Sequence, residues 1–256
     1  MQNSPKAFIT GSSRGIGRAI ALELAHRGHD ILLHYRKNLT EAKQTQKAIE
    51  ALGRKTWLYQ ADLCEISQTR TLLETITLEH NELDIFVANA ASTAFKPLMQ
   101  ITSDNVGKTF ALVIQSFLLC LQGLQPLLKS KKGRVLTISG IDTVQYCPQH
   151  ALLAAAKSAL ETLTHYACVE LASDGIKAKC LNPGLVASDS TKFYLGSAFD
   201  SVCASANTIA PQGGFKTPED VAKLAAFLLS PDSDWVAAKT VYADGGLSFL
   251  MPTTWN

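Results

Sequence analysis

The sequence carries little charge and has no pattern typical of a nucleic-acid-binding or membrane protein. Charged residues make up 18% of the 256 residues, and the formal net charge is +2. A balance this close to neutral argues against nucleic acid or an anionic membrane surface as a partner. The longest apolar stretch, residues 110–128, is interrupted by three glutamines and a proline, which predicts a buried or interface helix and no membrane span. Because no signal segment precedes the first strand, we expect a cytoplasmic protein.

The cysteines and histidines lack the spacing of a metal site or a disulfide framework. No Cys-x-x-Cys pair occurs among the six cysteines, most of which stand in apolar segments, so buried reduced thiols are expected. The histidines are scattered, and no zinc-type spacing joins them to cysteines or carboxylates. We therefore predict no metal.

The most informative motif is TGSSRGIG at residues 10–17. It follows the apolar strand 7–9 and precedes an amphipathic helix. Glycines let the backbone turn sharply, and the helix N-terminus offers N–H groups and a positive dipole end to a phosphate. Any tight strand-to-helix turn can be rich in glycine. This one opens a strand–helix–strand unit, which favours dinucleotide binding.

Strands and helices alternate along the rest of the chain. Near-continuous apolar strands separated by helices predict a parallel sheet covered on both faces. We predict an α/β, single-domain Rossmann fold over residues 1–256, with a doubly wound parallel sheet and a substrate loop at about 188–214. The expected strands are 7–9, 30–35, 56–59, 83–87, 134–138, 176–181 and 240–242; the expected helices are 16–25, 40–52, 66–79, 105–129, 151–172 and one starting at 217–220.

Motifs along the whole chain resemble those of the short-chain dehydrogenase/reductase family. They are TGSSRGIG, Asp62-Leu63, ANAA at 88–91, Lys157 in AAAKSAL, NPGLVAS at 182–188, TPEDVA at 217–222 and ADGG at 243–246. Within the family, VANAAS at 87–92 and HYACVEL at 165–171 are most similar to acyl-carrier-protein-linked reductases of the enoyl or 3-oxoacyl type. The resemblance implies a cofactor site formed by Gly11, Ser13, Gly15, Ile16, Gly17, Asp62, Leu63, Asn89, Lys157, Pro183, Gly184 and Val186, the last three beside the nicotinamide.

The end of the second strand indicates which dinucleotide is bound. An NAD enzyme usually has Asp or Glu there to bind the ribose 2′-hydroxyl. This chain has Tyr35, then Arg36 and Lys37, with Arg14 in the glycine loop. Guanidinium groups bind a 2′-phosphate that a carboxylate would repel, so we predict NADP(H). The alternative is that these cations are ordinary solvated surface charges.

The catalytic positions depart from the family pattern. The family places a tyrosine four residues before the lysine, a serine thirteen residues before that tyrosine, and an asparagine on the preceding long helix. Counting back from Lys157 gives Leu153, Gly140 and about Val113. None of these three side chains exchanges protons.

Two nearby residues are candidate proton donors beside Lys157. Enoyl reductases place the tyrosine seven residues before the lysine, and His150 stands there; an imidazolium can donate a proton near neutral pH. The alternative is a partly exposed histidine at a helix start. Tyr146 is a second candidate donor. Ser139 could replace the serine only if the strand end shifted by one residue, which would turn its side chain to the other face.

Two classes of function remain open. The first is an NADPH-dependent reductase of a carbonyl or an activated double bond, with His150 or solvent as proton donor. The second is a degenerate scaffold that performs dehydration, cyclisation or isomerisation, or only binds. Apolar residues in 188–214 predict an apolar substrate, free or carrier-linked, unless they pack on the core or a neighbouring subunit. By resemblance we expect a homotetramer or homodimer through the 105–129 and 151–172 helices, with a contribution from the tail 247–255.

Overall fold

A parallel seven-stranded sheet runs through the computed structural model, which describes residues 4–249. The strand order β3-β2-β1-β4-β5-β6-β9 means that the chain builds outward from β1 to one edge and then returns to build the other half. Such a reversal leaves a crevice outside the carboxyl ends of β1 and β4. The strands are β1 (Lys6–Ile9), β2 (Asp30–Tyr35), β3 (Thr56–Gln60), β4 (Ile85–Ala88), β5 (Arg134–Ile138), β6 (Lys177–Asn182) and β9 (Thr240–Tyr242).

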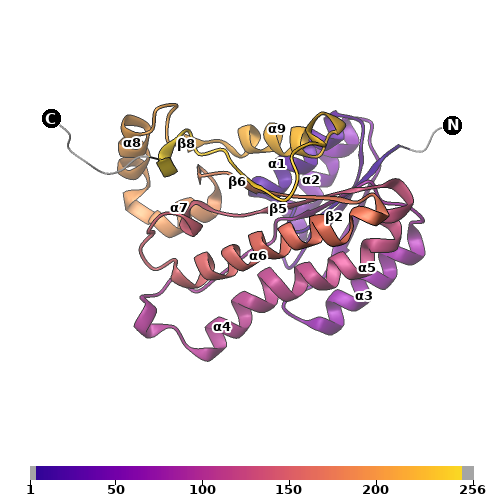
Figure 1. The fold of residues 1–256 in the computed structure, drawn as a ribbon, viewed down its shortest axis with the longest axis horizontal. Coiled ribbons are helices and arrows are strands. Elements are labelled where there is room, and N and C mark those ends of the chain that lie inside the picture. The colour runs from indigo at the N-terminus through magenta and orange to yellow at the C-terminus, as the bar shows by residue number, and fades with distance from the viewer. Residues whose placement is uncertain (1–3, 250–256) are drawn as a thin grey trace.

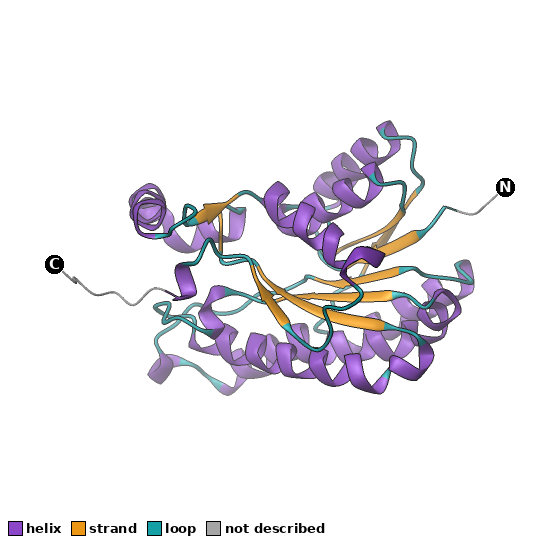
Figure 2. Ribbon diagram, turned by 45° about the horizontal axis from the view of Figure 1, so that its top comes forward, coloured by secondary structure: helices purple, strands orange, loops and turns teal. Residues whose placement is uncertain are grey.

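Helices cover both faces of this sheet (Figures 1 and 2). One face carries α1 (Gly15–His26), α2 (Leu39–Ala51) and α9 (Pro218–Leu228). The other carries α3 (Ile66–Glu79), α5 (Ser116–Lys131) and α6 (Ala151–Glu170). This arrangement confirms the predicted α/β Rossmann fold with a doubly wound parallel sheet.

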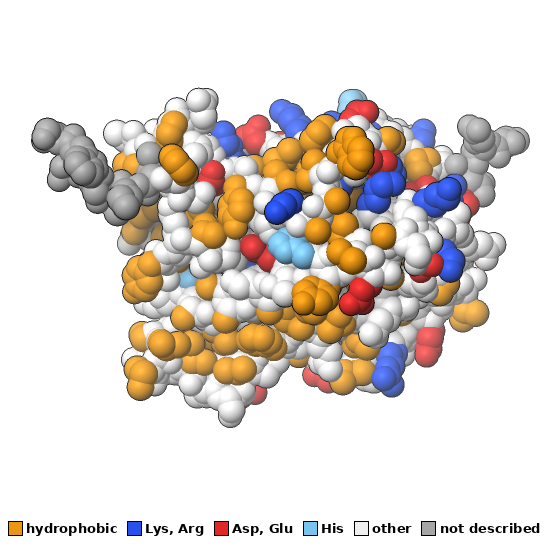
Figure 3. All heavy atoms as spheres, viewed as in Figure 1, with side chains coloured by type: hydrophobic (Ala, Val, Ile, Leu, Met, Phe, Trp, Pro, Cys, Tyr) orange, Lys and Arg blue, Asp and Glu red, His pale blue; other side chains and the backbone are white. Residues whose placement is uncertain are grey.

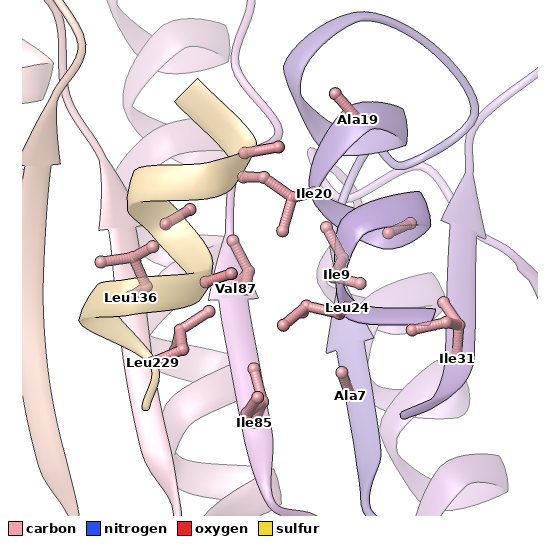
Figure 4. Close-up of a cluster of buried hydrophobic side chains, with 14 of the residues drawn as sticks. Ala7, Ile9, Ala19, Ile20, Leu24, Ile31, Ile85, Val87, Leu136 and Leu229 are labelled. Atoms are coloured by element: carbon pink, nitrogen blue, oxygen red, sulfur yellow. The ribbon is translucent and has the colours of Figure 1, made fainter. Parts of the chain in front are cut away.

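Buried apolar side chains fill the space on each side of the sheet. Ile20 and Leu24 of α1 are almost fully buried and point toward the strands and α9 (Figure 4). Ile9 packs in that cluster, whereas its neighbour Phe8 faces the opposite side and stacks on Phe86, with ring centroids 5.8 Å apart. Burial of alternate strand residues on opposite faces explains why the strands read as continuous apolar runs.

The long helix expected over 105–129 is divided by a π-helical turn. α4 (Ser103–Phe110) passes through the turn Ala111–Gln115 into α5. The helical stretch Ser103–Lys131 is long and apolar enough to cross a membrane, with a mean hydropathy of 1.6 in its most apolar window. Half of that window is buried inside the structure, as in a core helix.

The segment 188–214, expected as a loop, contains two helices. Ser188 caps α7 (Asp189–Leu195) by accepting a hydrogen bond from the Thr191 N–H. α8 (Phe199–Ile209) follows, and the short strands β7 (Leu185–Val186) and β8 (Phe215–Lys216) pair across the base of the segment. A serine at the N-cap followed by small and apolar residues is a helix signal. This signal was not used when the segment was predicted to be a loop.

All six cysteines are free thiols; Cys120 and Cys180 are buried, whereas the other four, expected to be buried, are only partly so. In residues 4–249 no group of three or more His, Cys, Asp or Glu side chains is placed to hold a metal ion. Of the tail expected at an interface, residues 250–255 lie outside the described residues.

Candidate active site

The glycine loop joins β1 to α1 at the crevice between β1 and β4. Gly11 and Gly15 have φ values of 64° and 56°, in the left-handed region that other residues seldom adopt. Gly17 is required for a different reason, since a Cβ there would lie 2.4 Å from the carbonyl oxygen of Gly11. The loop can therefore approach α1 closely only with glycine at this position.

Side chains from two neighbouring strands hold the loop in place. The Nδ1 atom of His34 accepts a hydrogen bond from the Gly11 N–H at 3.0 Å, and its Nε2 lies 3.1 Å from the Ala61 carbonyl oxygen. Directly after β4, the Asn89 amide donates to the carbonyl oxygens of Thr10 and Gly11, at 2.9 and 3.2 Å. Asn89 thus fixes the loop, in addition to the cofactor contact that the family resemblance implies.

The N-terminus of α1 fits a dinucleotide phosphate. Arg14 occupies the N-cap position but no side chain caps the helix there, so the first-turn N–H groups lack a side-chain acceptor. A Cβ on Gly15 would have no heavy atom within 4 Å, so the space in front of the helix is open. Ser13 and Ile16 flank this position and are half-buried. Anions bind readily at such helix ends.

Residues after β2 and β3 form the other end of the predicted cofactor site. Arg36 is exposed, and its Nη1 lies 4.0 Å from Asp62 Oδ2. Tyr35 is buried, with its hydroxyl 3.5 Å from Gln60 Oε1. Leu63, the residue after Asp62, is buried. A guanidinium at the carboxyl end of β2 is therefore available to an anion.

Lys157 lies on the buried face of α6, where its ammonium group donates to the Ile138 carbonyl oxygen at the end of β5. Burial lowers the pKa of its amino group, and the negative charge of Asp142 opposes that shift. The structure thus points a cation at the carboxyl edge of the sheet.

The segment that follows β6 forms the opposite side of the candidate site from the glycine loop. The Asn182 amide donates to the Gly140 carbonyl oxygen at 2.7 Å and to Thr143 Oγ1 at 3.2 Å. Gly184 has φ 67°, and a Cβ there would lie 2.6 Å from the Cα of Asp244. Pro183 and Val186, predicted with Gly184 to flank the nicotinamide, are also buried.

His150 is the N-cap residue of α6 and stands seven residues, or about two helical turns, before Lys157. Its ring packs against Phe95 and Tyr194, with centroid distances of 4.8 and 4.3 Å, and those two rings lie 4.9 Å from each other. Its Nδ1 lies 3.1 Å from Asp142 Oδ2. The Nε2 atom is buried and has no hydrogen-bond partner within residues 4–249.

The other candidate donors are placed differently. Tyr146 is 90% exposed on the loop before α6. Ser139 is buried and donates its hydroxyl to Glu161 of α6. This placement follows from the alternation of side chains along β5.

The three side chains around His150 were not recognised from the sequence as its neighbours. Asp142, Phe95 and Tyr194 come from three separate segments, and only folding brings them together. The one local signal was a carboxylate two residues after Gly140, at the end of a strand.

The chain matches known reductases along nearly its full length. A family model described as enoyl-(acyl carrier protein) reductase matches residues 11–248. Over 246 residues the chain is 32% identical to 1-cyclohexenylcarbonyl-CoA reductase of Streptomyces collinus, covering 96% of this chain and 88% of that protein. It is 27% identical to 3-oxoacyl-(acyl-carrier-protein) reductase FabG of Staphylococcus aureus, covering 96% and 99%.

Solved structures with the same fold are numerous. A short-chain dehydrogenase from Burkholderia cenocepacia in complex with NADP superimposes with a TM-score of 0.86 at 28% identity, covering 95% of this chain and 97% of that one. The L-sorbose reductase of Gluconobacter frateurii, complexed with NADPH and L-sorbose, gives a TM-score of 0.89 at 23% identity, covering 97% and 98%. The similarity to the L-sorbose reductase concerns the fold alone.

Proposed function

The chain belongs to the enoyl-(acyl carrier protein) reductase family of short-chain dehydrogenases/reductases, and on that premise we propose that it reduces the activated double bond of an apolar thioester with NADPH. The observation that carries the proposal is His150, whose Nε2 is buried without a partner two helical turns before Lys157. This placement gives the site a candidate proton donor although Leu153 stands at the family's tyrosine position.

The cofactor is NADP(H). The uncapped N-terminus of α1 suits the pyrophosphate, Lys157 suits the ribose, and Arg36, with Arg14 at the N-cap, suits the 2′-phosphate. The Burkholderia relative was solved in complex with NADP. When bound, NADPH supplies a hydride.

The chemistry of an enoyl thioester matches the side chains present. Gly140, Leu153 and Val113 offer no hydroxyl or amide with which to protonate the oxygen of a simple ketone. Hydride addition to the double bond of an enoyl thioester gives a thioester enolate. This enolate delocalises its charge and takes up a proton at carbon, so it needs less acid assistance. The name of the Streptomyces relative describes such a substrate, a cyclohexenylcarbonyl thioester.

The substrate's apolar part would lie against α7 and α8. Tyr194 and Phe95 form the ring contacts at His150, while Phe199 packs edge-to-face on Phe215 with centroids 5.9 Å apart. We assign segment 188–214 as the substrate-binding segment. A carrier protein or coenzyme A would hold the thioester's polar end outside.

We also propose a homotetramer or homodimer that assembles through α4, α5 and α6 and acts in the cytoplasm. Hydrophobic side chains gather on the face over α4 and α6 (Figure 3). Val106, Tyr166 and Val169 are 41%, 64% and 69% exposed on these helices. An apolar face of this kind is typical of a subunit interface.

The function is tested by following NADPH oxidation with enoyl-CoA and 3-oxoacyl-CoA substrates of matched chain length. We expect turnover of the enoyl series, and a loss on the order of 10²–10⁴-fold in kcat for His150→Ala, as for removal of a general acid. His26→Ala, at an exposed position on α1, is the matched control. Tyr146→Phe is expected to retain activity because Tyr146 is directed to solvent.

One outcome would overturn the proposal in favour of the degenerate scaffold. The protein would bind NADPH, seen as a change in cofactor fluorescence, yet oxidise it with none of the thioesters. Product analysis by mass spectrometry would then distinguish a non-redox conversion of the thioester from binding alone.

A further inference from the structure

Asp142 places a carboxylate directly behind the imidazole of His150. It lies in the 3₁₀ turn Ile141–Thr143 that follows β5, and its side chain is 5% exposed. Its Oδ2 lies 3.1 Å from His150 Nδ1, within hydrogen-bond distance. A carboxylate this buried requires such a partner, because desolvation of an unpaired charge is costly.

Gly140 leaves the space that this carboxylate occupies. Its backbone is extended, with φ −160° and ψ 158°, a conformation that any residue adopts. A Cβ on Gly140 would nevertheless lie 2.6 Å from Asp142 Oδ1. A side chain at position 140 would therefore require the carboxylate of Asp142, the end of a flexible side chain, to move from this position.

The loop that carries His150 is held from several sides. Gln149 has φ 60°, a left-handed conformation rare for a residue other than glycine. The hydroxyl of Tyr194 donates to the Pro148 carbonyl oxygen at 2.6 Å, while the Tyr194 ring packs on His150. Strained backbone persists where the surrounding contacts over-determine it, and such places are often functional sites.

We propose that Asp142 is a positioning residue that orients His150, and that Gly140 is required to make room for it. This inference rests on the proposed function, in which His150 is the proton donor. The carboxylate holds the proton on Nδ1, so Nε2 is the nitrogen that exchanges a proton with substrate. In the donation step the Nε2–H bond of the imidazolium breaks and a C–H bond forms on the enolate carbon. The ring becomes neutral with Nδ1–H still bonded to Asp142, and the negative charge of the enolate is discharged.

The pair replaces two hydroxyl side chains of the family by a carboxylate and an imidazole. Gly140 and His150 are then not independent departures from the family pattern. Gly140 makes room for Asp142, and Asp142 orients His150. If Gly140 were instead a position that had merely lost its hydroxyl, restoring a side chain there would be harmless or helpful.

The test combines a spectrum that does not depend on activity with kinetics. Two-bond ¹H–¹⁵N correlation spectra report which imidazole nitrogen carries the proton, and the His150→Gln variant assigns the His150 signals. We expect the neutral ring of the wild-type protein to be protonated on Nδ1, and Asp142→Ala to shift it toward the Nε2-protonated tautomer. A wild-type ring protonated on Nε2, or one that Asp142→Ala leaves unchanged, would overturn the proposal.

The kinetic arm uses Asp142→Asn and Gly140→Ala, with Asp232→Asn at an exposed position as control. We expect the first two to lower kcat on the order of 10²-fold with a smaller change in the KM for thioester, as for a misplaced catalytic group. Full activity in Gly140→Ala or Asp142→Asn would contradict the proposal. If no thioester is turned over at all, the proposed function fails, and the ring spectrum alone decides whether Asp142 orients His150.

Discussion

The imidazole of His34 bridges the glycine loop and the end of β3, with its Nδ1 3.0 Å from the Gly11 nitrogen and its Nε2 3.1 Å from the Ala61 carbonyl oxygen. Since Nδ1 accepts from the N–H, Nε2 must carry the proton that it donates. The ring is therefore neutral in the folded protein. Burial lowers its pKa to about 4 from an ordinary value of 6.5.

This bridge predicts an acid sensitivity of the fold. The unfolded chain protonates His34 near pH 6.5 and the folded one only near pH 4, so the free energy of unfolding should fall as the pH drops through that window. The full loss from this residue is about 3 kcal/mol. Denaturant unfolding at several pH values should show the fall in the wild-type protein and a flatter profile in His34→Gln. His26→Gln, at an exposed site, should keep the wild-type profile.

Substitutions at two glycines of the loop should distinguish an effect on stability from an effect on cofactor binding. A Cβ at position 17 meets the Gly11 backbone, so Gly17→Ala should destabilise the protein by roughly 1–3 kcal/mol. Gly15→Ala places its methyl in open space and incurs only the strain of a positive φ, about 1–2 kcal/mol. It should remain folded yet bind NADPH weakly, because the methyl fills the phosphate position. Thermal unfolding and NADPH fluorescence titration check both; equal binding by Gly15→Ala and wild type would contradict this assignment.

Short-range patterns were sufficient to predict the sheet and the glycine loop. The strands are apolar runs. The N-terminal cap of α9 can be recognised in the sequence from Thr217 and Asp220, which form a capping box in the structure. The boundaries of α6 were predicted within two residues, since its start and the stop at Gly175 are local signals. The π-helical turn was missed because it depends on packing and not on composition.

Contacts between distant segments could not be read in the same way. Phe95 and Tyr194 meet at His150 from 55 residues before it and 44 after it, and no periodicity records that meeting. The sequence alone did not distinguish His34 from the other residues of its buried strand, although both of its ring nitrogens form hydrogen bonds. The pairing of Asp142 with His150 depends on the course of an irregular loop, which single-sequence patterns do not determine.

Arg36 should set the preference for the phosphorylated dinucleotide. Its guanidinium is half exposed and 4.0 Å from Asp62, so it is available for charge-assisted hydrogen bonds to a 2′-phosphate. Arg36→Ala is expected to weaken NADPH binding on the order of 10-fold, with little effect on NADH, because the partial exposure of the site reduces the gain. Titrations of both cofactors measure the ratio. Lys37→Ala is the neighbouring control, and a loss of equal size there would mean that surface charge in general attracts NADPH.

Lys157 and Lys179 are both buried, but their replacement by methionine should affect NADPH binding differently. Lys157 lies at the proposed cofactor site, and burial lowers the pKa of its amino group, so Lys157→Met removes a desolvated charge. Replacing such a charge by an apolar side chain of similar size is often neutral or stabilising. We therefore expect Lys157→Met to keep or raise the melting temperature while NADPH binding weakens and kcat/KM falls at least on the order of 10²-fold.

Lys179 is the matched case outside the site. Its ammonium group donates to the Leu228 carbonyl oxygen at 2.9 Å and to Ser233 Oγ at 2.6 Å, and burial lowers its pKa to about 8. Ser233 still donates to Leu228 without it, at 2.9 Å, so Lys179→Met leaves that carbonyl oxygen bonded. Calorimetry and NADPH titration should show a change in stability with unchanged cofactor affinity. If Lys179→Met weakened NADPH binding as much as Lys157→Met, the effect would be a general consequence of removing a buried charge, and Lys157 would lose its assigned role at the ribose.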